Sequence, residues 1–336
     1  MHSLRIGSAN GRLYLNGVHR TGTMRVPTHE SPVVMPHIAL VTTAAAHDLD
    51  DDLLPLAAAL RARGADVSII DWDDPTTDWS RFDIALLRSP WDYTQRATEF
   101  LAWAEHAAAR TRLLNPIDIV RWNVDKHYLG DLAARGVSIV PSRFIEPHED
   151  AELRIDTFLS AHAEAAEFVV KPAIGAGSRD AQRHARSAHD DAIAHVRRLL
   201  DAERSVLLQP YLDRVDEVGE TSLIYIEGEF SHAIRKGALL QRGADSTRAL
   251  FAPEQITART PDAAERDLAQ RTLAAIPFGQ PLLYARVDLI RDDTGEPRLL
   301  ELELTEPSLF FAQSAGSAER FARALLARAT THWVTD

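Results

Sequence analysis

The chain has 336 residues, of which 45% are hydrophobic and 26% are charged, and its formal net charge is -12. This length indicates two or three domains with cores of their own, and the acidic balance argues against a nucleic-acid partner. The absence of cysteine excludes disulfides, thiolate catalysis and cysteine-ligated metals, and is compatible with the cytoplasmic location that we expect. No apolar run is long enough to cross a bilayer, so we expect no membrane partner.

Residues 1–35 differ from everything that follows. Gly, Ser, Asn, Thr, Arg and Pro dominate there without a sustained hydrophobic period, so we expect a flexible and dispensable N-terminal extension, with Met35 as an alternative start. Residues 36–116 then alternate strand and helix, which predicts a parallel α/β domain. The expected strands are 37–42, 66–70, 82–87 and a short one ending at Leu114, and the expected helices begin at Leu53 and near Glu99.

Two further blocks complete the chain. Residues 117–210 predict a central subdomain with a helix ending near Gly136, strands at 138–144, 167–171 and 206–209, and a helix at 190–202. Residues 211–336 predict a C-terminal subdomain that holds a hairpin turning at Glu227-Gly228, a second hairpin and a final amphipathic helix.

The second hairpin is the most informative stretch. Its last strand alternates strictly, with Leu300, Leu302 and Leu304 expected on one face and Glu301 and Glu303 on the other. Turn-forming residues at 291–297 connect it to another alternating strand, 284–290, so the two strands should pair antiparallel.

This pairing would bring Asp288 beside the two glutamates. Three oxygen-bearing side chains on one sheet face repel one another unless a cation lies among them, and Mg²⁺ is the simplest candidate. A solvated acidic sheet face is the alternative.

Three other segments carry groups that could bind a nucleotide. They are Lys126 at a helix start, Lys171 at a strand end followed by the loop with Gly175, Gly177 and Ser178, and the run Gln209, Pro210, Tyr211 and Leu212. Glycines let the backbone amides approach phosphate oxygens, and a proline leaves neighbouring backbone groups available to a ligand. A surface lysine, an ordinary flexible loop and a domain linker are the alternatives.

The loop after the third predicted strand holds Ser89, Trp91, Asp92 and Tyr93. Ligands of parallel sheets bind at the carboxyl ends of the strands, so we expect a small amino acid substrate there, with Asp92 on its ammonium group. Alternatively, Trp91 and Tyr93 pack a domain interface and Asp92 caps the next helix.

Taken in order, these motifs resemble the ATP-grasp superfamily of ADP-forming ligases in a glutathione-synthetase-like arrangement. R-W-N-x-D-K-x-Y-L, S-H-A-I-R-K, Y-A-R-V-D-L and E-L-E-L-x-E-P-S-L-F-F are similar to the O-ureido-D-serine cyclo-ligase group, which closes the ring of D-cycloserine. The resemblance implies a mixed α/β (α+β) ATP-grasp fold of three subdomains, with ATP between the central and C-terminal ones. It implies a small-molecule substrate, and a homodimer is left open.

The resemblance also implies roles for residues. Lys126 and Lys171 would contact ATP phosphates, Gly175, Gly177 and Ser178 would close over them, Gln209 to Leu212 would present backbone to adenine, and Glu217 would hold the ribose. Asp288, Glu301 and Glu303 would bind Mg²⁺, and Arg235 and Arg286 would face the reacting carboxylate as catalytic residues. Glu303 departs from the family pattern, where asparagine is frequent, and this leaves the number of metal ions open.

The chemistry implied is phosphoryl transfer from ATP to a carboxylate, followed by attack of an amine on the acyl phosphate, with cations stabilising the charge on the phosphate oxygens. The alternatives are an intermolecular carboxylate–amine ligase such as a dipeptide former, a metal-dependent phosphohydrolase, and a non-catalytic nucleotide-binding module.

Overall fold

The computed structural model describes residues 35–247, 249–250, 255–279 and 282–329. The predicted extension lies outside the described residues except for Met35. No helix within the described ranges is long and apolar enough to cross a membrane.

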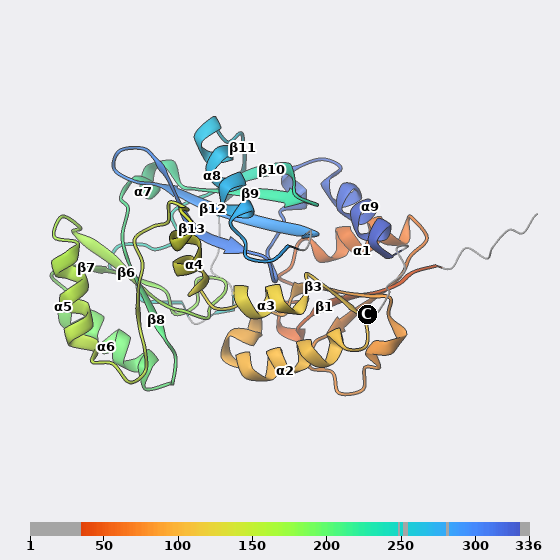
Figure 1. The fold of residues 1–336 in the computed structure, drawn as a ribbon, viewed down its shortest axis with the longest axis horizontal. Coiled ribbons are helices and arrows are strands. Elements are labelled where there is room, and N and C mark those ends of the chain that lie inside the picture. Colours follow the sequence, from red (N-terminus) through yellow and green to blue (C-terminus); the bar gives the residue numbers. More distant parts are fainter. Residues whose placement is uncertain (1–34, 248, 251–254, 280–281, 330–336) are drawn as a thin grey trace, which may run out of the picture. The chain divides into compact units, whose positions relative to one another are not determined.

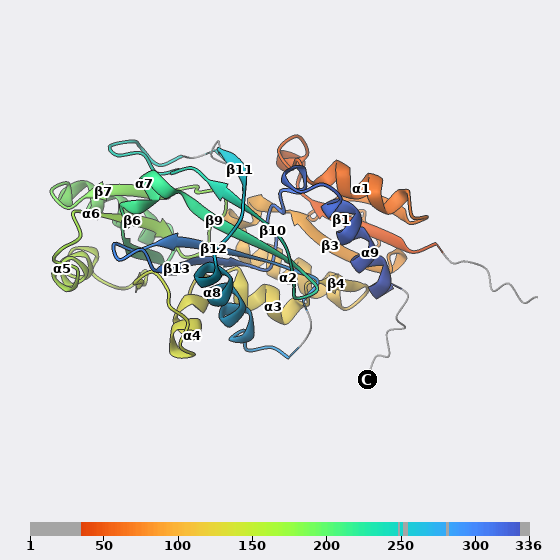
Figure 2. The same ribbon diagram turned by 90° about the horizontal axis from the view of Figure 1, so that it is seen from above.

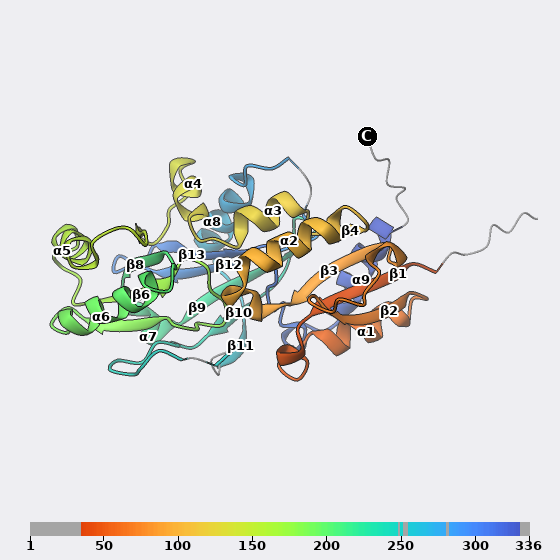
Figure 3. The ribbon, with the colours of Figure 1, turned by 90° about the horizontal axis from the view of Figure 1, so that it is seen from below.

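The first sheet has four parallel strands in the order β2-β1-β3-β4, and Figure 1 labels its two central strands, β1 and β3. Its elements are β1 (His37–Thr42), α1 (Leu53–Arg61), β2 (Asp66–Asp71), β3 (Ile84–Ser89), α2 (Ala97–Ala108) and β4 (Arg112–Leu114). Strand β1 sends alternate residues into two cores, Ile38 and Leu40 toward α1 and Ala39 and Val41 toward α2. The sheet is therefore covered on both faces, as parallel sheets are, and Figure 3 shows α2 beside β4.

The central sheet is antiparallel in the order β5-β8-β6-β7. Its elements are β5 (Arg143–Ile145), α5 (Ala151–Ala161), β6 (Glu167–Pro172), β7 (Gln182–Ala185), α6 (His189–Leu200) and β8 (Val206–Pro210), preceded by α3 (Ile117–Asn123) and α4 (Tyr128–Ala134). Two short helices thus stand where one was expected before Gly136. The strand predicted at 138–144 is mostly irregular because Ser138 and Val140 hydrogen-bond the backbone of Leu299 instead.

The third sheet is antiparallel in the order β11-β10-β9-β12-β13. Its elements are α7 (Arg214–Val218), β9 (Glu220–Ile226), β10 (Glu229–Lys236), β11 (Ile256–Arg259), α8 (Ala263–Ala274), β12 (Tyr284–Arg291), β13 (Pro297–Glu303) and α9 (Ser317–Ala329). Helix α9 packs beside α1 and shares its core (Figure 2), so the end of the chain returns to the first sheet. The division into three subdomains with the stated boundaries stays a prediction.

Candidate active site

The hairpin of β12 and β13 forms the floor of the candidate site. Its register pairs Asp288 with Glu301 and Arg286 with Glu303, so the three acids predicted as neighbours do share one face. The side chains of Glu301 and Glu303 remain 23% and 26% exposed, respectively, and both line one cavity. The prediction that β12 and β13 bring these carboxylates together is therefore confirmed by the register.

The strict alternation of β13 is interrupted by a bulge. After the pair Asp288–Glu301 the register shifts, so that Leu289 lies opposite Leu299 and Leu300 is the extra residue. Leu299 consequently joins the core and Leu300 lines the cavity. The prediction that Leu300 shares the core face with the following leucines is wrong, because strict alternation cannot account for an inserted residue.

Two lysines from the central block converge on Glu301. Lys126 Nζ lies 3.0 Å from one carboxylate oxygen, and Lys171 Nζ lies 4.0 Å from the other. Burial opposes ionisation of Glu301, but the two lysines outweigh it and hold its pKa below the ordinary value. Burial lowers the pKa of Lys171. These contacts span the central and third sheets, so the cavity is a cleft between those two sheets.

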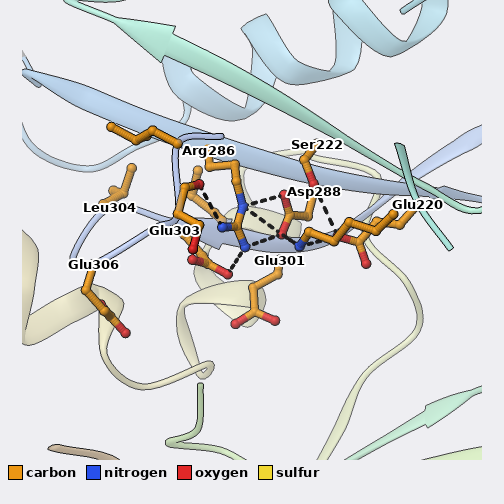
Figure 4. A network of polar contacts seen from close by, with 12 residues as sticks. Glu220, Ser222, Arg286, Asp288, Glu301, Glu303, Leu304 and Glu306 are labelled. Carbon is orange, nitrogen blue, oxygen red and sulfur yellow. Dashed lines mark hydrogen bonds and ion pairs between the residues drawn. The ribbon is translucent and has the colours of Figure 1, made fainter. Parts of the chain in front are cut away.

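Arg286 contacts the other two acids of the hairpin (Figure 4), and Lys236 lies beside one of them, Asp288. Arg286 donates to Asp288 at 2.9 Å and to Glu303, and Lys236 Nζ lies 3.1 Å from Asp288 and 2.8 Å from Glu220. Burial opposes ionisation of Asp288, but Arg286 and Lys236 outweigh it and lower its pKa.

The pKa values of Glu303 and Glu220 shift in the opposite direction. Burial, reinforced by neighbouring acids, raises the pKa of Glu303 to about 8, and burial together with Asp288 raises that of Glu220 to about 7. Their cationic partners only partly oppose this effect.

The donor set fits Mg²⁺. Asp288, Glu301 and Glu303 offer carboxylate oxygens, which are the ligands this ion prefers, and the raised pKa of Glu303 marks a place where negative charge is under-compensated. Within the described residues, however, no three His, Cys, Asp or Glu side chains already surround a single point, because each of the three acids is turned toward a lysine or arginine.

The glycine loop lies against the lysines. Lys126 Nζ donates to the carbonyl oxygen of Gly175 at 2.7 Å, which holds the start of the loop over the cavity. Gly177 and Ser178 both have positive φ, at 61° and 59°, and a glycine adopts this conformation without strain. All three loop residues predicted to close over the phosphates line the cavity.

The segment Gln209 to Leu212 also lines the cavity, whereas Glu217 does not. Glu217 lies on α7, where its backbone oxygen accepts a hydrogen bond from Arg235 Nη2. The acidic side chain of β9 that lines the cavity is that of Glu220.

Arg235 is not brought into the cavity lining, and its neighbour Lys236 is. The two residues are adjacent in β10, so their side chains point to opposite faces of the sheet. Arg235 Nε donates to the backbone oxygen of Val218 at 2.6 Å on the other face. The arginine pair predicted from the sequence is thus replaced in the cavity by Arg286 and Lys236.

Of the four residues predicted to bind substrate in the loop after β3, only two line the cavity. Trp91 and Tyr93 line the cavity, and Trp91 Nε1 donates to the backbone oxygen of Glu306 at 3.0 Å. Asp92 accepts from Trp72 Nε1 at 2.8 Å and forms an ion pair with Arg96.

Ser89 is fully buried, with its hydroxyl bonded to that of Thr42 at 2.8 Å. Neither Asp92 nor Ser89 lines the cavity.

The structure adds residues that the sequence motifs did not assign: Asn123, Glu220, Lys236, Glu306 and Ser308. Glu306 stands in the E-L-E-L-x-E-P-S motif, five residues after Glu301, and a strand period does not extend past the end of β13. Its cavity position could not be inferred from the alternation.

Comparisons with known proteins agree with this geometry. Residues 38–115 match the family model described as D-cycloserine synthetase DcsG, N-terminal domain. The chain is 44% identical over 295 residues to the cycloserine biosynthesis protein DcsG of Streptomyces lavendulae, an alignment that covers 87% of this chain and 98% of that relative. The crystal structure of D-cycloserine synthetase DcsG has a TM-score of 0.83 at 43% identity, covering 88% of this chain and 100% of that one.

More distant solved structures share the fold alone. D-alanine–D-alanine ligase from Bacillus anthracis has a TM-score of 0.62 at 15% identity, covering 88% of this chain and 97% of the ligase. The ATP-grasp ligase PsnB, complexed with a precursor peptide and AMPPNP, has a TM-score of 0.57 at 19% identity, covering 88% and 98%. Solved members of this fold hold ATP, or Mg and ADP, so binding of nucleotide and Mg²⁺ is a general property of the fold.

Proposed function

Because this chain belongs to the DcsG family of ATP-grasp ligases, we propose that it activates the carboxylate of O-ureido-D-serine with ATP and closes the ring of D-cycloserine. It is an ATP-dependent ligase that forms a carbon–nitrogen bond. The observation that carries the proposal is the convergence of Lys126 and Lys171 on Glu301 at the edge of one cavity, together with the identity to DcsG over most of the chain.

The lysines and the loop are suited to hold a triphosphate. Lys126 and Lys171 present two ammonium groups to one point of the cavity, beside the loop of Gly175 and Gly177. Phosphoryl transfer needs positioning and positive charge rather than a covalent enzyme nucleophile, and these residues supply both. Gln209 to Leu212 line the same cavity and offer backbone groups to a base.

Asp288, Glu301 and Glu303 would hold Mg²⁺, which when bound would neutralise charge on the phosphate oxygens. Arg286 is the cation suited to orient the reacting carboxylate, since it lies in the cavity between Asp288 and Glu303 and also donates to the backbone oxygen of Ser308 at 3.1 Å. Lys236 stands beside it in the site where the sequence had suggested Arg235.

With the carboxylate activated as an acyl phosphate, the aminooxy nitrogen of the same molecule attacks it and phosphate leaves. One water molecule then hydrolyses the bond between the ring nitrogen and the carbamoyl carbon, which releases the carbamoyl group as CO₂ and ammonia and leaves a proton on the ring nitrogen. A closed loop over the phosphates protects the acyl phosphate from water.

The test is ADP release measured over a panel of amino acids that includes O-ureido-D-serine, with the product mass determined. Release of ADP and cycloserine from O-ureido-D-serine without a second amine is the expected result. ADP formation that requires an added amine would instead make the protein an intermolecular carboxylate–amine ligase, and ADP formation without any amino acid would indicate a phosphohydrolase.

A further inference from the structure

Five acidic side chains line the cavity, and one of them is electrostatically different from the rest. Glu220, Asp288, Glu301 and Glu303 each lie within ion-pair distance of a lysine or arginine. Glu306 has no such partner among the described residues, although Lys126 and Arg286 act on it from farther away. Figure 4 shows it apart from the carboxylates that Arg286 contacts.

Glu306 is nevertheless held firmly in place. It is 9% exposed, its carboxylate lies beside the Tyr93 hydroxyl, and its backbone oxygen accepts a hydrogen bond from Trp91 Nε1. Both aromatic residues come from the loop after β3, so Glu306 sits where that loop meets the end of the acidic hairpin. Burial raises the pKa of Tyr93 well above its ordinary value, which keeps the hydroxyl a hydrogen-bond donor.

A buried carboxylate without a cation is costly, and proteins retain such a group only where something else repays the cost. Burial raises the pKa of Glu306 to about 7, so the protein itself does not stabilise the ionised form. A ligand that brings a positive charge would stabilise it. The nearby guanidinium of Arg286 suits the opposite, carboxylate end of the same ligand.

We propose that Glu306, oriented by Tyr93, is the subsite for the ammonium group of the amino acid substrate and sets the preference for amino over non-amino carboxylates. This inference rests on the proposed function, since it deepens the description of the same site. It also replaces the sequence expectation for Asp92, whose carboxylate is already bonded to Trp72 and Arg96 outside the cavity lining. Glu306 binds the substrate directly, and Tyr93 acts as a positioning residue.

The experiment compares O-ureido-D-serine with 3-[(carbamoylamino)oxy]propanoate, which lacks only the ammonium group. ADP release gives kcat/KM for both compounds in the wild type and in the variants E306Q, Y93F, D92N and E164Q. Glu164 is exposed on the surface, so E164Q is a matched control for loss of one carboxylate. The preference ratio, and the KM for ATP, are the quantities of interest.

We expect the wild type to prefer the amino compound by about tenfold or more, which is typical of a hydrogen bond between charged groups. E306Q should lose most of that preference with the KM for ATP unchanged, Y93F should lose a smaller part, and E164Q should keep it. If E306Q does not fold, a wild-type ratio near one still overturns the proposal, and the ratios of Y93F and D92N decide whether a preference comes from the Glu306 corner or from Asp92. A ratio near one, or a loss of preference in D92N but not in E306Q, would overturn the proposal.

Failure of the proposed function is recognised separately. If O-ureido-D-serine releases no ADP but another amino acid of the panel does, the same comparison is made with that amino acid and its desamino counterpart. A preserved preference that E306Q removes would support the ammonium subsite and reject the cyclo-ligase assignment. ADP release only with non-amino carboxylates would overturn both.

Discussion

The electrostatics of Glu306 predict that its neutral isostere stabilises the protein at alkaline pH. The pKa of this carboxyl is about 7 in the folded chain against an ordinary value of 4.5, first because of burial, with Glu301 adding to the effect. An acid whose pKa is raised by folding costs no stability below its unfolded pKa. The cost develops as the pH rises from about 4.5 and is complete above about 7.

The size of the effect follows from these two pKa values. Their difference corresponds to a free energy of unfolding on the order of 3 kcal/mol, which wild type loses between acid and alkaline pH and E306Q does not. For a chain of this length we expect a melting temperature higher by roughly 4–6 °C in E306Q at pH 8 or above, and nearly equal values at pH 4.5. Tyr93, Lys126, Glu301 and Arg286 surround the side chain at position 306 in both proteins, so the difference isolates the charge of Glu306.

The assay is thermal or urea unfolding of wild type, E306Q and the control E164Q over a series of pH values without ligands. The difference between E306Q and wild type should grow with pH, while that between E164Q and wild type stays flat. A difference that is independent of pH, or one in which wild type gains on E306Q as pH rises, would refute the view that Glu306 lacks a compensating cation.

Three further predictions concern other parts of the chain. Replacing Glu301 with Gln should abolish ADP formation while leaving the circular dichroism spectrum unchanged, and full activity at limiting Mg²⁺ would exclude a ligand role for this carboxylate. Arg242 follows the cavity-lining Leu239 and Leu240 in the chain and donates to the buried Glu167 of β6 at 2.6 Å, so R242A should raise the KM for ATP several-fold with little change in kcat, and an unchanged KM would show that this contact does not hold the segment in place for the nucleotide. Deleting residues 1–34 should leave melting temperature and turnover nearly unchanged, and a large loss of either would show that these residues dock on the rest of the protein.

The acidic hairpin could be predicted from the sequence because its evidence is local. A period of two, a turn-rich connector and antiparallel pairing suffice to place Asp288 opposite Glu301. The bulge at Leu300 could not be predicted, since one inserted residue leaves the composition of the strand unchanged and is revealed only by its partner strand. The same limit applies to the helices: α5 and α8 have low amphipathicity, and the sequence did not single them out.

The second limit of the sequence was that it does not show which face of a strand meets the cavity. Alternation says that Arg235 and Lys236 lie on opposite faces of β10, but it does not say which face meets the cavity. That choice depends on what packs on each side. Arg235 is engaged by the backbone of α7 through Val218, which leaves the cavity face to Lys236.

The third limit was that a single sequence does not reveal contacts between distant segments. Such contacts form the part of the site where we expect the amino acid substrate. The loop after β3 was predicted to bind the substrate because ligands of parallel sheets bind at such loops, and two of its side chains line the cavity. Trp91 reaches the backbone of Glu306 across 215 positions of sequence, and no local period constrains such a contact. The carboxylate of Asp92 is bonded to Trp72 and Arg96. The carboxylate of this corner that has no ion-pair partner among the described residues is therefore that of Glu306, which lies on the segment after β13. A single sequence can therefore identify the loop after β3 and the segment after β13 as parts of the site. Which acid meets the ligand, Asp92 or Glu306, depends on how the first sheet packs against the hairpin.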